Sequence, residues 1–142
     1  MTTSKEARSS KKLGTTRLYN FYLLNPKKPT ALLIDTPGYG FQKGGAIYAR
    51  RNTKMLLEYV KFGTKIKLLL FLLNAQIGWK ASDLAMMEKI NKYKRPVQIV
   101  AMKSDKILDI QNYYEMMLKI SAFKSQFDCC NSAIHICSNK YD

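Results

Sequence analysis

An acidic residue and a glycine stand directly after an apolar run near the amino end of this chain. The run over 32–34 ends at Asp35, and Pro37 and Gly38 follow at once, so a strand is predicted to stop there and the backbone to turn. A carboxylate at the carboxyl end of a buried strand can reach Mg²⁺, often through water, and a glycine amide can donate to a phosphate oxygen. The alternative is a strand that ends in an Asx-type turn with no ligand.

Three other polar groups are predicted to lie at the same edge, because they also flank the ends of strands. Thr16 can offer its hydroxyl to Mg²⁺ and its backbone N–H to a terminal phosphate. Asp105, with Lys103 beside it, suits guanine, because one carboxylate accepts hydrogen bonds from both N1–H and the 2-amino group. The backbone of Cys137 and Ser138 can donate to the guanine O6. Any one of these residue patterns arises easily by chance. The presence of all four in a consistent order along the sequence favours a nucleotide site.

Hydrophobic periodicity predicts the elements that position these groups. They are strands over 17–24 and 30–35, a helix over 47–62, a strand over 66–73, a helix over 82–94, a strand over 97–102, a helix over 109–123 and a strand over 132–137. The first two strands are predicted to form an antiparallel hairpin, because a five-residue connection with two prolines is too short for a crossover. The nearly all-apolar strand over 66–73 is typical of a parallel strand buried on both faces, and Ser82 is the expected N-cap of the second helix. This order predicts an α/β fold with a mixed, mostly parallel sheet.

The charge balance of the chain points to a polyanionic partner. Its 142 residues, about one domain, contain 24 Lys and Arg against 10 Asp and Glu, a formal net charge of +14. Such a field favours RNA, ribosomes or anionic membrane, although the lysines could also be ordinary solvated surface. No apolar run approaches the roughly 20 residues of a membrane span, and residues 1–12 lack the apolar core of a secretory signal. We therefore expect an intracellular protein, with cytoplasm, mitochondrion and plastid left open.

The three cysteines show no metal-binding spacing of the C-x-x-C type. Cys129 and Cys130 are vicinal and pair with each other only with difficulty, so a reducing compartment is indicated. Together with His135, they and Cys137 could form a metal cluster. The favoured interpretation is instead the alternating side chains of a late strand.

Four stretches of the sequence resemble the EngB (YihA) family of the TrmE–Era–EngA–EngB–septin-like GTPases. They are residues 10–22, 35–40, 102–106 and 136–140, and the resemblance runs from about residue 8 to the end. The motif Asp-x-Pro-Gly-Tyr-Gly at 35–40 is fairly specific to EngB. The resemblance implies a P-loop GTPase-like, three-layer α/β fold, binding of GTP or GDP with Mg²⁺, slow hydrolysis, and a role in assembly of the large ribosomal subunit. The implied partners are a guanine nucleotide and ribosomal RNA or the large subunit, with the protein as a monomer.

The resemblance also implies a set of site residues. For GTP they are Gly14, Thr15, Thr16, Arg17, Leu18, Asp35, Thr36, Pro37, Gly38, Met102, Lys103, Ser104, Asp105, Ile136, Cys137 and Ser138. For Mg²⁺ they are Thr16 and, through a water molecule, Asp35. Tyr39 stands where other GTPases carry a catalytic glutamine, so no catalytic residue is assigned.

The sequence departs from the family pattern in several places. Leu13, Thr15, Met102 and Asn139 are unusual for their motifs, and no G-x-x-x-x-G-K-[ST] stretch occurs in the 142 residues. We therefore expect a basic flexible segment over 1–13 and an incomplete G domain over 14–142, without the phosphate loop, the first strand and the last helix. Two alternatives remain: a nucleotide-independent, basic RNA- or ribosome-binding module derived from a GTPase, and an unrelated α/β domain.

Overall fold

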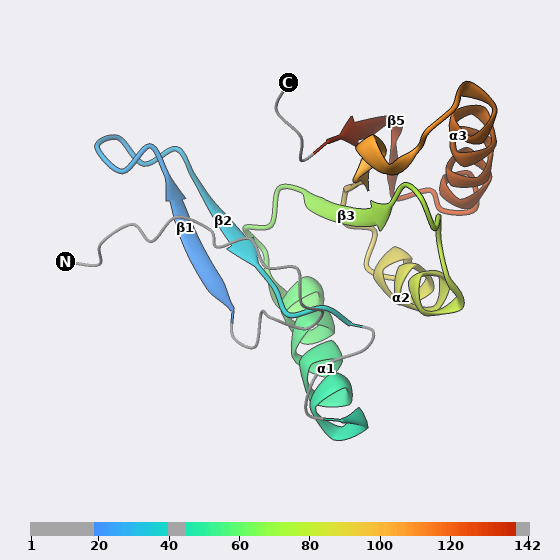
Figure 1. The fold of residues 1–142 in the computed structure, drawn as a ribbon. Coiled ribbons are helices and arrows are strands. Elements are labelled where there is room, and N and C mark those ends of the chain that lie inside the picture. The colour runs from blue at the N-terminus through green and yellow to red at the C-terminus, as the bar shows by residue number, and fades with distance from the viewer. Residues whose placement is uncertain (1–18, 40–44, 139–142) are drawn as a thin grey trace. The chain divides into compact units, whose positions relative to one another are not determined.

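The computed structural model describes residues 19–39 and 45–138 (Figure 1). The chain divides into two compact units, Met1–Leu56 and Leu57–Asp142, and the first helix, α1 (Ala46–Phe62), runs across their boundary. In the described part of the chain, no helix combines the length and the apolar character needed to cross a membrane. The two units are described one at a time below.

The first unit contains the predicted hairpin. Strands β1 (Asn20–Leu24) and β2 (Ala31–Asp35) pair antiparallel, with Asn20 opposite Asp35. Asn25 begins the connecting turn in the left-handed region, at φ 53°, and its carbonyl accepts a hydrogen bond from the Lys28 N–H at 3.1 Å. The prediction of an antiparallel hairpin is confirmed.

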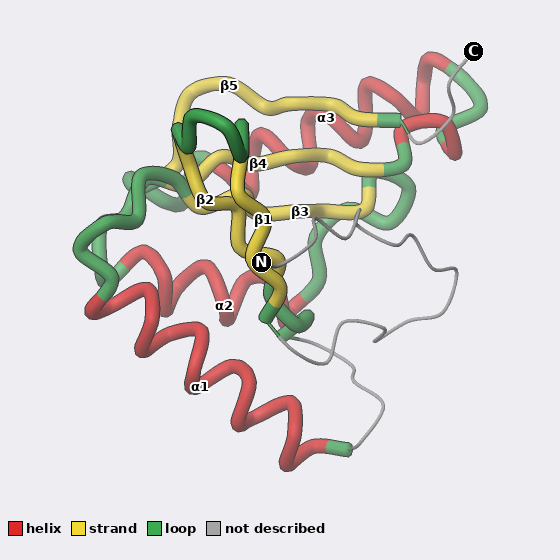
Figure 2. The backbone as a smooth tube through the Cα atoms, turned by 90° about the vertical axis from the view of Figure 1, so that its left-hand side faces the viewer, coloured by secondary structure: helices red, strands yellow, loops and turns green. Residues whose placement is uncertain are grey.

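The second unit is built on a parallel sheet (Figure 2). Its elements are β3 (Leu69–Asn74), α2 (Ala81–Asn91), β4 (Val97–Met102), α3 (Ile110–Lys124) and β5 (Cys130–Cys137). The strand order β3-β4-β5 follows the sequence, and both strand pairs are parallel. Since parallel crossovers are right-handed, two successive steps in one direction bring both helices to the same face of the sheet.

The predicted α/β fold class is therefore confirmed. A mixed sheet contains both antiparallel and parallel pairs of strands. In the described chain the antiparallel pair forms the sheet β1-β2 and the parallel pairs form a separate sheet, β3-β4-β5. Within the described residues, β2 and β3 each have a hydrogen-bonded neighbour on one side. Each of them is thus an edge strand.

The core of the second unit centres on Phe123 of α3, which is fully buried. Its ring lies 6.2 Å from the ring of Phe71 on β3, and 5.4 Å from the rings of both Trp79 and Phe127. Phe123 therefore joins the sheet to the loop after β3 and to the connection before β5. Ile99 of β4 is also fully buried, so the middle strand of the sheet contributes side chains to this core.

One face of β3 differs from the prediction. Phe71 and Leu73 are buried, whereas Leu70 and Leu72 are 52% and 56% exposed. The expectation that this strand is buried on both faces is wrong for the described residues. The reason is topological, because α2 and α3 both cover the face that carries Phe71.

The boundaries of α2 also differ from those predicted. Lys80, not Ser82, is the N-cap, and its backbone N–H donates to the carboxylate of Asp83 at 2.7 Å. The helix ends at Asn91 rather than at Lys94, which lies in the left-handed region at φ 50°. The chain must leave helical geometry there, because the residue before a proline, here Arg95, is disfavoured in a helix.

Strand β5 begins at Cys130, two residues before the predicted start. Its register with β4 shifts between Val97 and Ile99, which marks a bulge. The side chain of Gln98 on β4, a residue that is only 5% exposed, makes hydrogen bonds to this irregular stretch. Its Nε2 donates to the carbonyl of Ala133 at 2.7 Å, and its Oε1 accepts from Nδ2 of Asn131 at 3.2 Å. The buried Gln98 amide thus holds the start of β5, including Asn131, which the sequence pattern did not assign to a strand.

Candidate functional site

The loops after β4 and β5 lie next to each other at the carboxyl edge of the parallel sheet. Met102 and Cys137, the last residues of the two strands, are register partners, so the strands end level. Just beyond them, the hydroxyl of Ser138 donates to Oδ1 of Asp105 at 3.4 Å. Two groups that are 33 residues apart in the sequence are therefore in contact at this edge, where the strand pattern predicted them to meet.

The loop after β4 holds its carboxylate in a defined position. Lys103 adopts a left-handed conformation, at φ 64°, and starts a 3₁₀ turn, η1 (Ser104–Lys106). The turn is closed by a hydrogen bond of 3.0 Å from the Ile107 N–H to the Ser104 carbonyl. The Asp105 side chain is only 11% exposed, with Nζ of Lys106 at 4.0 Å. A carboxylate fixed in this way can accept two parallel hydrogen bonds from a planar donor pair.

The first unit holds the other described candidates. Asp35 ends β2, and its Oδ2 accepts a hydrogen bond from Nδ2 of Asn20 at 3.2 Å. The carboxylate is exposed and has the oxygen chemistry that Mg²⁺ prefers. Thr36 is half-buried and Pro37 is buried, which anchors the start of the following loop.

At Gly38 the described chain leaves room beside the backbone. A Cβ built there would meet no described atom within 4 Å, and Gly38 does not have a positive φ. Neither crowding nor conformation within the described chain therefore explains a glycine at this position. The open space leaves the backbone of Gly38 accessible on that side within the described chain.

The remaining predicted residues lie outside the part that the structure describes. They are Gly14, Thr15, Thr16, Arg17 and Leu18, together with the unusual Leu13 and Asn139. The structure therefore brings together Asp105 and Ser138, and it positions Asp35 and Gly38 separately on the first unit. The assignment of all these residues to a nucleotide remains a prediction.

Cys129 and Cys130, at the start of β5, are partly buried and favour the protonated thiol. Burial raises the pKa of Cys130 to about 12, and neighbouring Cys129 adds to the shift. Burial also raises the pKa of Cys129. Metal ligation needs the thiolate, so both shifts oppose it. Among the residues that the structure describes, no three His, Cys, Asp or Glu side chains are grouped so that they could hold a metal ion.

A cleft of about 320 Å³ beside the end of the turn η1 was not predicted from the sequence. It lies between the loop after β3 and the first half of α3, and is lined by Ala75, Gln76, Ile77, Gly78, Lys106, Ile107, Leu108, Asp109, Asn112, Glu115, Met116 and Lys119. The local signal in the sequence was Gly78, a glycine shortly after the apolar run, which has a positive φ of 75° in the turn after β3. The helical half of the wall could not be found from sequence, because only the fold brings α3 to this loop.

The fold is that of a known class of nucleotide-binding proteins. The chain is similar to a crystal structure of Era in complex with MgGDPNP and nucleotides 1506–1542 of 16S ribosomal RNA, with a TM-score of 0.70 and 23% identity. That match covers 92% of this chain and 41% of the Era chain. A variant of Aquifex aeolicus Era bound to GDP.AlF4⁻ is similar with a TM-score of 0.67 and 22% identity. The fold class is thus that of P-loop GTPases.

The family assignment comes from the sequence comparisons. The model of the family described as "50S ribosome-binding GTPase" matches residues 1–103, and the chain belongs to this family. The "Probable GTP-binding protein EngB" of Streptococcus agalactiae is 36% identical over 101 residues, which are 71% of this chain and 50% of that protein. Its counterpart in Streptococcus equi subsp. equi is 34% identical over 123 residues, which are 86% of this chain and 60% of that protein. The chain therefore spans 50 to 60% of the length of these curated relatives.

Proposed function

We propose that this chain contributes the base-binding and metal-binding loops of a GTP site in a GTPase that assists assembly of the large ribosomal subunit. The observation that carries the proposal is the contact of 3.4 Å between Ser138 Oγ and Asp105 Oδ1 at the carboxyl edge of the sheet. Ligands of open α/β sheets bind outside this edge. The family description and the printed names of the relatives support the same function.

Each residue has a chemical role in this proposal. Asp105 accepts hydrogen bonds from N1–H and the 2-amino group of guanine, and the stem of Lys103 lies along the base. The backbone of Cys137 and Ser138 donates to O6, while Met102, Ser104 and Ile136 shape the two loops. Adenine lacks this donor pattern, so the arrangement selects GTP over ATP.

The phosphate side of the site rests on the first unit. Asp35 holds Mg²⁺ through a water molecule, Thr16 supplies a hydroxyl ligand, and the amide of Gly38 donates to the terminal phosphate. Gly14, Thr15, Arg17 and Leu18 precede or follow Thr16, and Thr36 and Pro37 shape the loop between Asp35 and Gly38. Bound Mg²⁺ neutralises charge that develops on the phosphates during slow hydrolysis to GDP.

The test is a titration of the chain with fluorescent GDP and GTP in the presence of Mg²⁺, with ATP as competitor. We expect guanine-selective binding that Asp105→Ala abolishes. Asp105→Asn replaces an acceptor by a donor, so it is expected to favour xanthine, which carries a carbonyl where guanine has its 2-amino group. Asp128→Asn removes an acidic residue from the opposite end of the sheet and serves as the control. Unchanged preference for GTP in Asp105→Ala would overturn the role of Asp105.

Weak nucleotide binding could mean that the GTP site needs further residues or that the chain has no GTP site. Repeating the titration with a longer chain distinguishes these two causes. If the 142 residues bind no nucleotide and the longer chain does, the GTP site needs residues beyond these. If neither binds, the proposal fails and the second candidate function takes its place.

The second candidate is a basic RNA- or ribosome-binding module that works inside the cell without nucleotide. The net charge of +14 favours it. RNA affinity would then fall steeply with added salt and remain the same with or without GTP. A loss of RNA binding on removal of GTP would exclude this candidate.

A further inference from the structure

The amino ends of the three parallel strands carry a concentration of positive charge. Three connections enter the strands there: residues 61–68 before β3, residues 92–96 before β4 and residues 124–129 before β5. Because all three strands are parallel, these connections meet at one end of the sheet. That end is opposite to the edge that carries Asp105 and Ser138.

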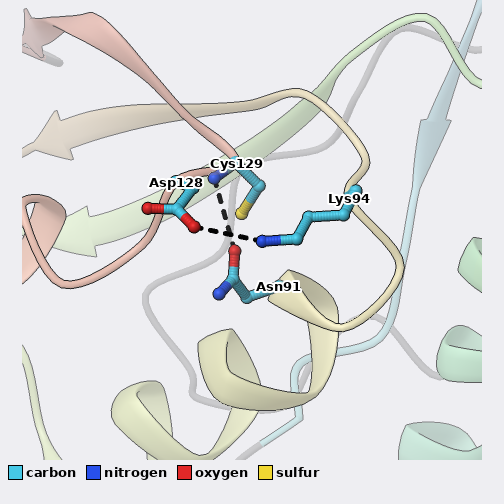
Figure 3. A network of polar contacts seen from close by, with 4 residues as sticks. All are labelled: Asn91, Lys94, Asp128 and Cys129. Carbon is cyan, nitrogen blue, oxygen red and sulfur yellow. Dashed lines mark hydrogen bonds and ion pairs between the residues drawn. The ribbon is translucent and has the colours of Figure 1, made fainter.

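Backbone hydrogen bonds join these connections to one another. The Leu69 N–H donates to the carbonyl of Pro96 at 2.9 Å, and the Val97 N–H donates to the carbonyl of Cys129 at 2.8 Å. The Cys129 N–H in turn donates to Oδ1 of Asn91, the last residue of α2, at 3.3 Å (Figure 3). The three connections therefore form one continuous surface rather than independent loops.

Two basic side chains help to build this surface. Arg95 donates from Nε to the carbonyl of Val60 at 3.1 Å and from Nη2 to the carbonyl of Lys61 at 3.3 Å, so it holds the carboxyl end of α1. Lys94 pairs with Asp128 at 3.1 Å, which Figure 3 also shows. These contacts fix the backbone from which the other lysines project.

The three connections contain seven basic residues and one acidic residue, Asp128. We call the seven the basic pole: Lys61, Lys65, Lys67, Lys92, Lys94, Arg95 and Lys124. Lys65, Lys67 and Lys92 are exposed, and no carboxylate of the described residues lies within ion-pair distance of them. Uncompensated charge of one sign on a fixed surface attracts a polyanion.

We propose that the basic pole binds the phosphate backbone of RNA. The pole is formed by three loops across a sheet end, not by the apolar face of an amphipathic helix that lies in a lipid surface. The exposed aromatic ring of Phe62 lies next to the pole, and the ammonium of Lys61 is 4.8 Å from its centroid, so a positive charge stands beside this apolar group. The ribosome named in the family description supplies RNA of this chemistry, and in this respect the inference rests on the proposed function.

The experiment measures binding of the whole 142-residue chain to a fluorescein-labelled RNA duplex of about 20 base pairs, without nucleotide, over a series of salt concentrations. The test variant is Lys65→Gln/Lys67→Gln/Lys92→Gln. The matched control, Lys80→Gln/Lys106→Gln/Lys119→Gln, removes the same charge from exposed lysines elsewhere on the second unit. Circular dichroism and thermal melting establish that both variants are folded.

We expect the test variant to bind RNA at least about tenfold more weakly and the control to bind like the wild type. The slope of log affinity against log salt is expected to fall by roughly 2 to 3 in the test variant alone, since each phosphate contact contributes close to one unit. Equal losses in both variants, or equal slopes, would overturn the proposal. Binding of the wild type to phosphatidylserine vesicles but not to RNA would also overturn it. Because no nucleotide is present, failure here leaves the GTP titration unaffected.

Discussion

The two ends of the parallel sheet use charge in opposite ways. At the carboxyl edge, the Asp105 side chain is 11% exposed, and the turn η1 and the Ser138 hydroxyl fix its position. At the amino end, Lys94 and Asp128 are 63% and 87% exposed, and most of the basic pole projects into solvent. A fixed carboxylate can recognise the shape of one base, whereas solvated lysines attract any polyanion. The difference teaches that one sheet can hold a fixed, nearly buried charge at one end and a group of solvated charges at the other, and our two proposals assign specificity to the first and non-specific affinity to the second.

The loops at both ends of the sheet are held by one hydrophobic core. Substitution of Phe123, at the centre of that core, is therefore expected to have the largest effect on stability. Its ring contacts Trp79 towards the carboxyl edge and Phe127 towards the amino end. Phe123→Ala is expected to lower the free energy of unfolding by about 3–5 kcal/mol, because it leaves a cavity in a packed core. Urea denaturation followed by circular dichroism measures this loss. The control Phe62→Ala, at a ring that is 67% exposed, is expected to cost about 0.5 kcal/mol or less, and equal losses would contradict the packing role of Phe123.

Arg95 tests whether the two ends act independently. Arg95→Gln removes the charged donors to the carbonyls of Val60 and Lys61, so we expect unfolding to become easier by about 1–2 kcal/mol. Guanine selectivity is expected to be unchanged, because the change lies at the amino end. Urea denaturation and nucleotide competition measure the two properties, with the exposed Lys92→Gln as control. A change in guanine selectivity would show that the ends are coupled.

The Cys130 thiol, at the amino end of the sheet, is expected to make the free energy of unfolding depend on pH. Its pKa is about 12 in the folded chain, above the ordinary value of 9.0, mainly because of burial. The unfolded chain releases this proton first, so the stability contributed by the buried thiol is complete below pH 9 and is lost as pH rises from 9 towards 12. Denaturant unfolding between pH 7 and pH 10.5 is expected to show a stability gap between wild type and Cys130→Ala that narrows above pH 9. A gap that stays constant would contradict the shift.

Ser138 is expected to give the smallest effect on stability. Its hydrogen bond to Asp105 is long, at 3.4 Å, and the residue is exposed. Ser138→Ala should therefore change the free energy of unfolding by about 0.5 kcal/mol or less, while guanine affinity falls by a few-fold because Asp105 is less well oriented. Thermal melting and nucleotide titration measure these changes, with Ser132→Ala, on the preceding strand β5, as control. A loss of stability without a loss of affinity would make Ser138 a structural residue only.

Much of the fold could be predicted because its signals are local. The strand over 97–102 is found with the predicted bounds, and the hairpin pairing and the helices follow their periodicity to within a few residues. The errors arise where tertiary contacts decide. Lys80 caps α2 because Asp83 reaches back to its N–H, and β5 starts early because the buried Gln98 amide satisfies its bulge.

The meeting of two loops of the candidate site was predictable for the same reason, whereas their binding of a nucleotide remains a prediction. The sequence alone indicated that Asp105 and Ser138 follow strands, and parallel pairing then brings their loops to one edge. It did not indicate the cleft beside Lys106, because the walls come from segments about 30 residues apart. It also gave no sign that Lys65 and Lys92 belong to one surface.

The sequence by itself determined the α/β class, the family motifs and the excess of positive charge, since these depend on residue type and short-range spacing. The tertiary structure decided which face of β3 is covered, how the Asp105 carboxylate is held, and where the charge collects. The physical reason is that parallel strands join loops that are distant in sequence. Right-handed crossovers then fix which face the helices cover and which residues meet at each end of the sheet.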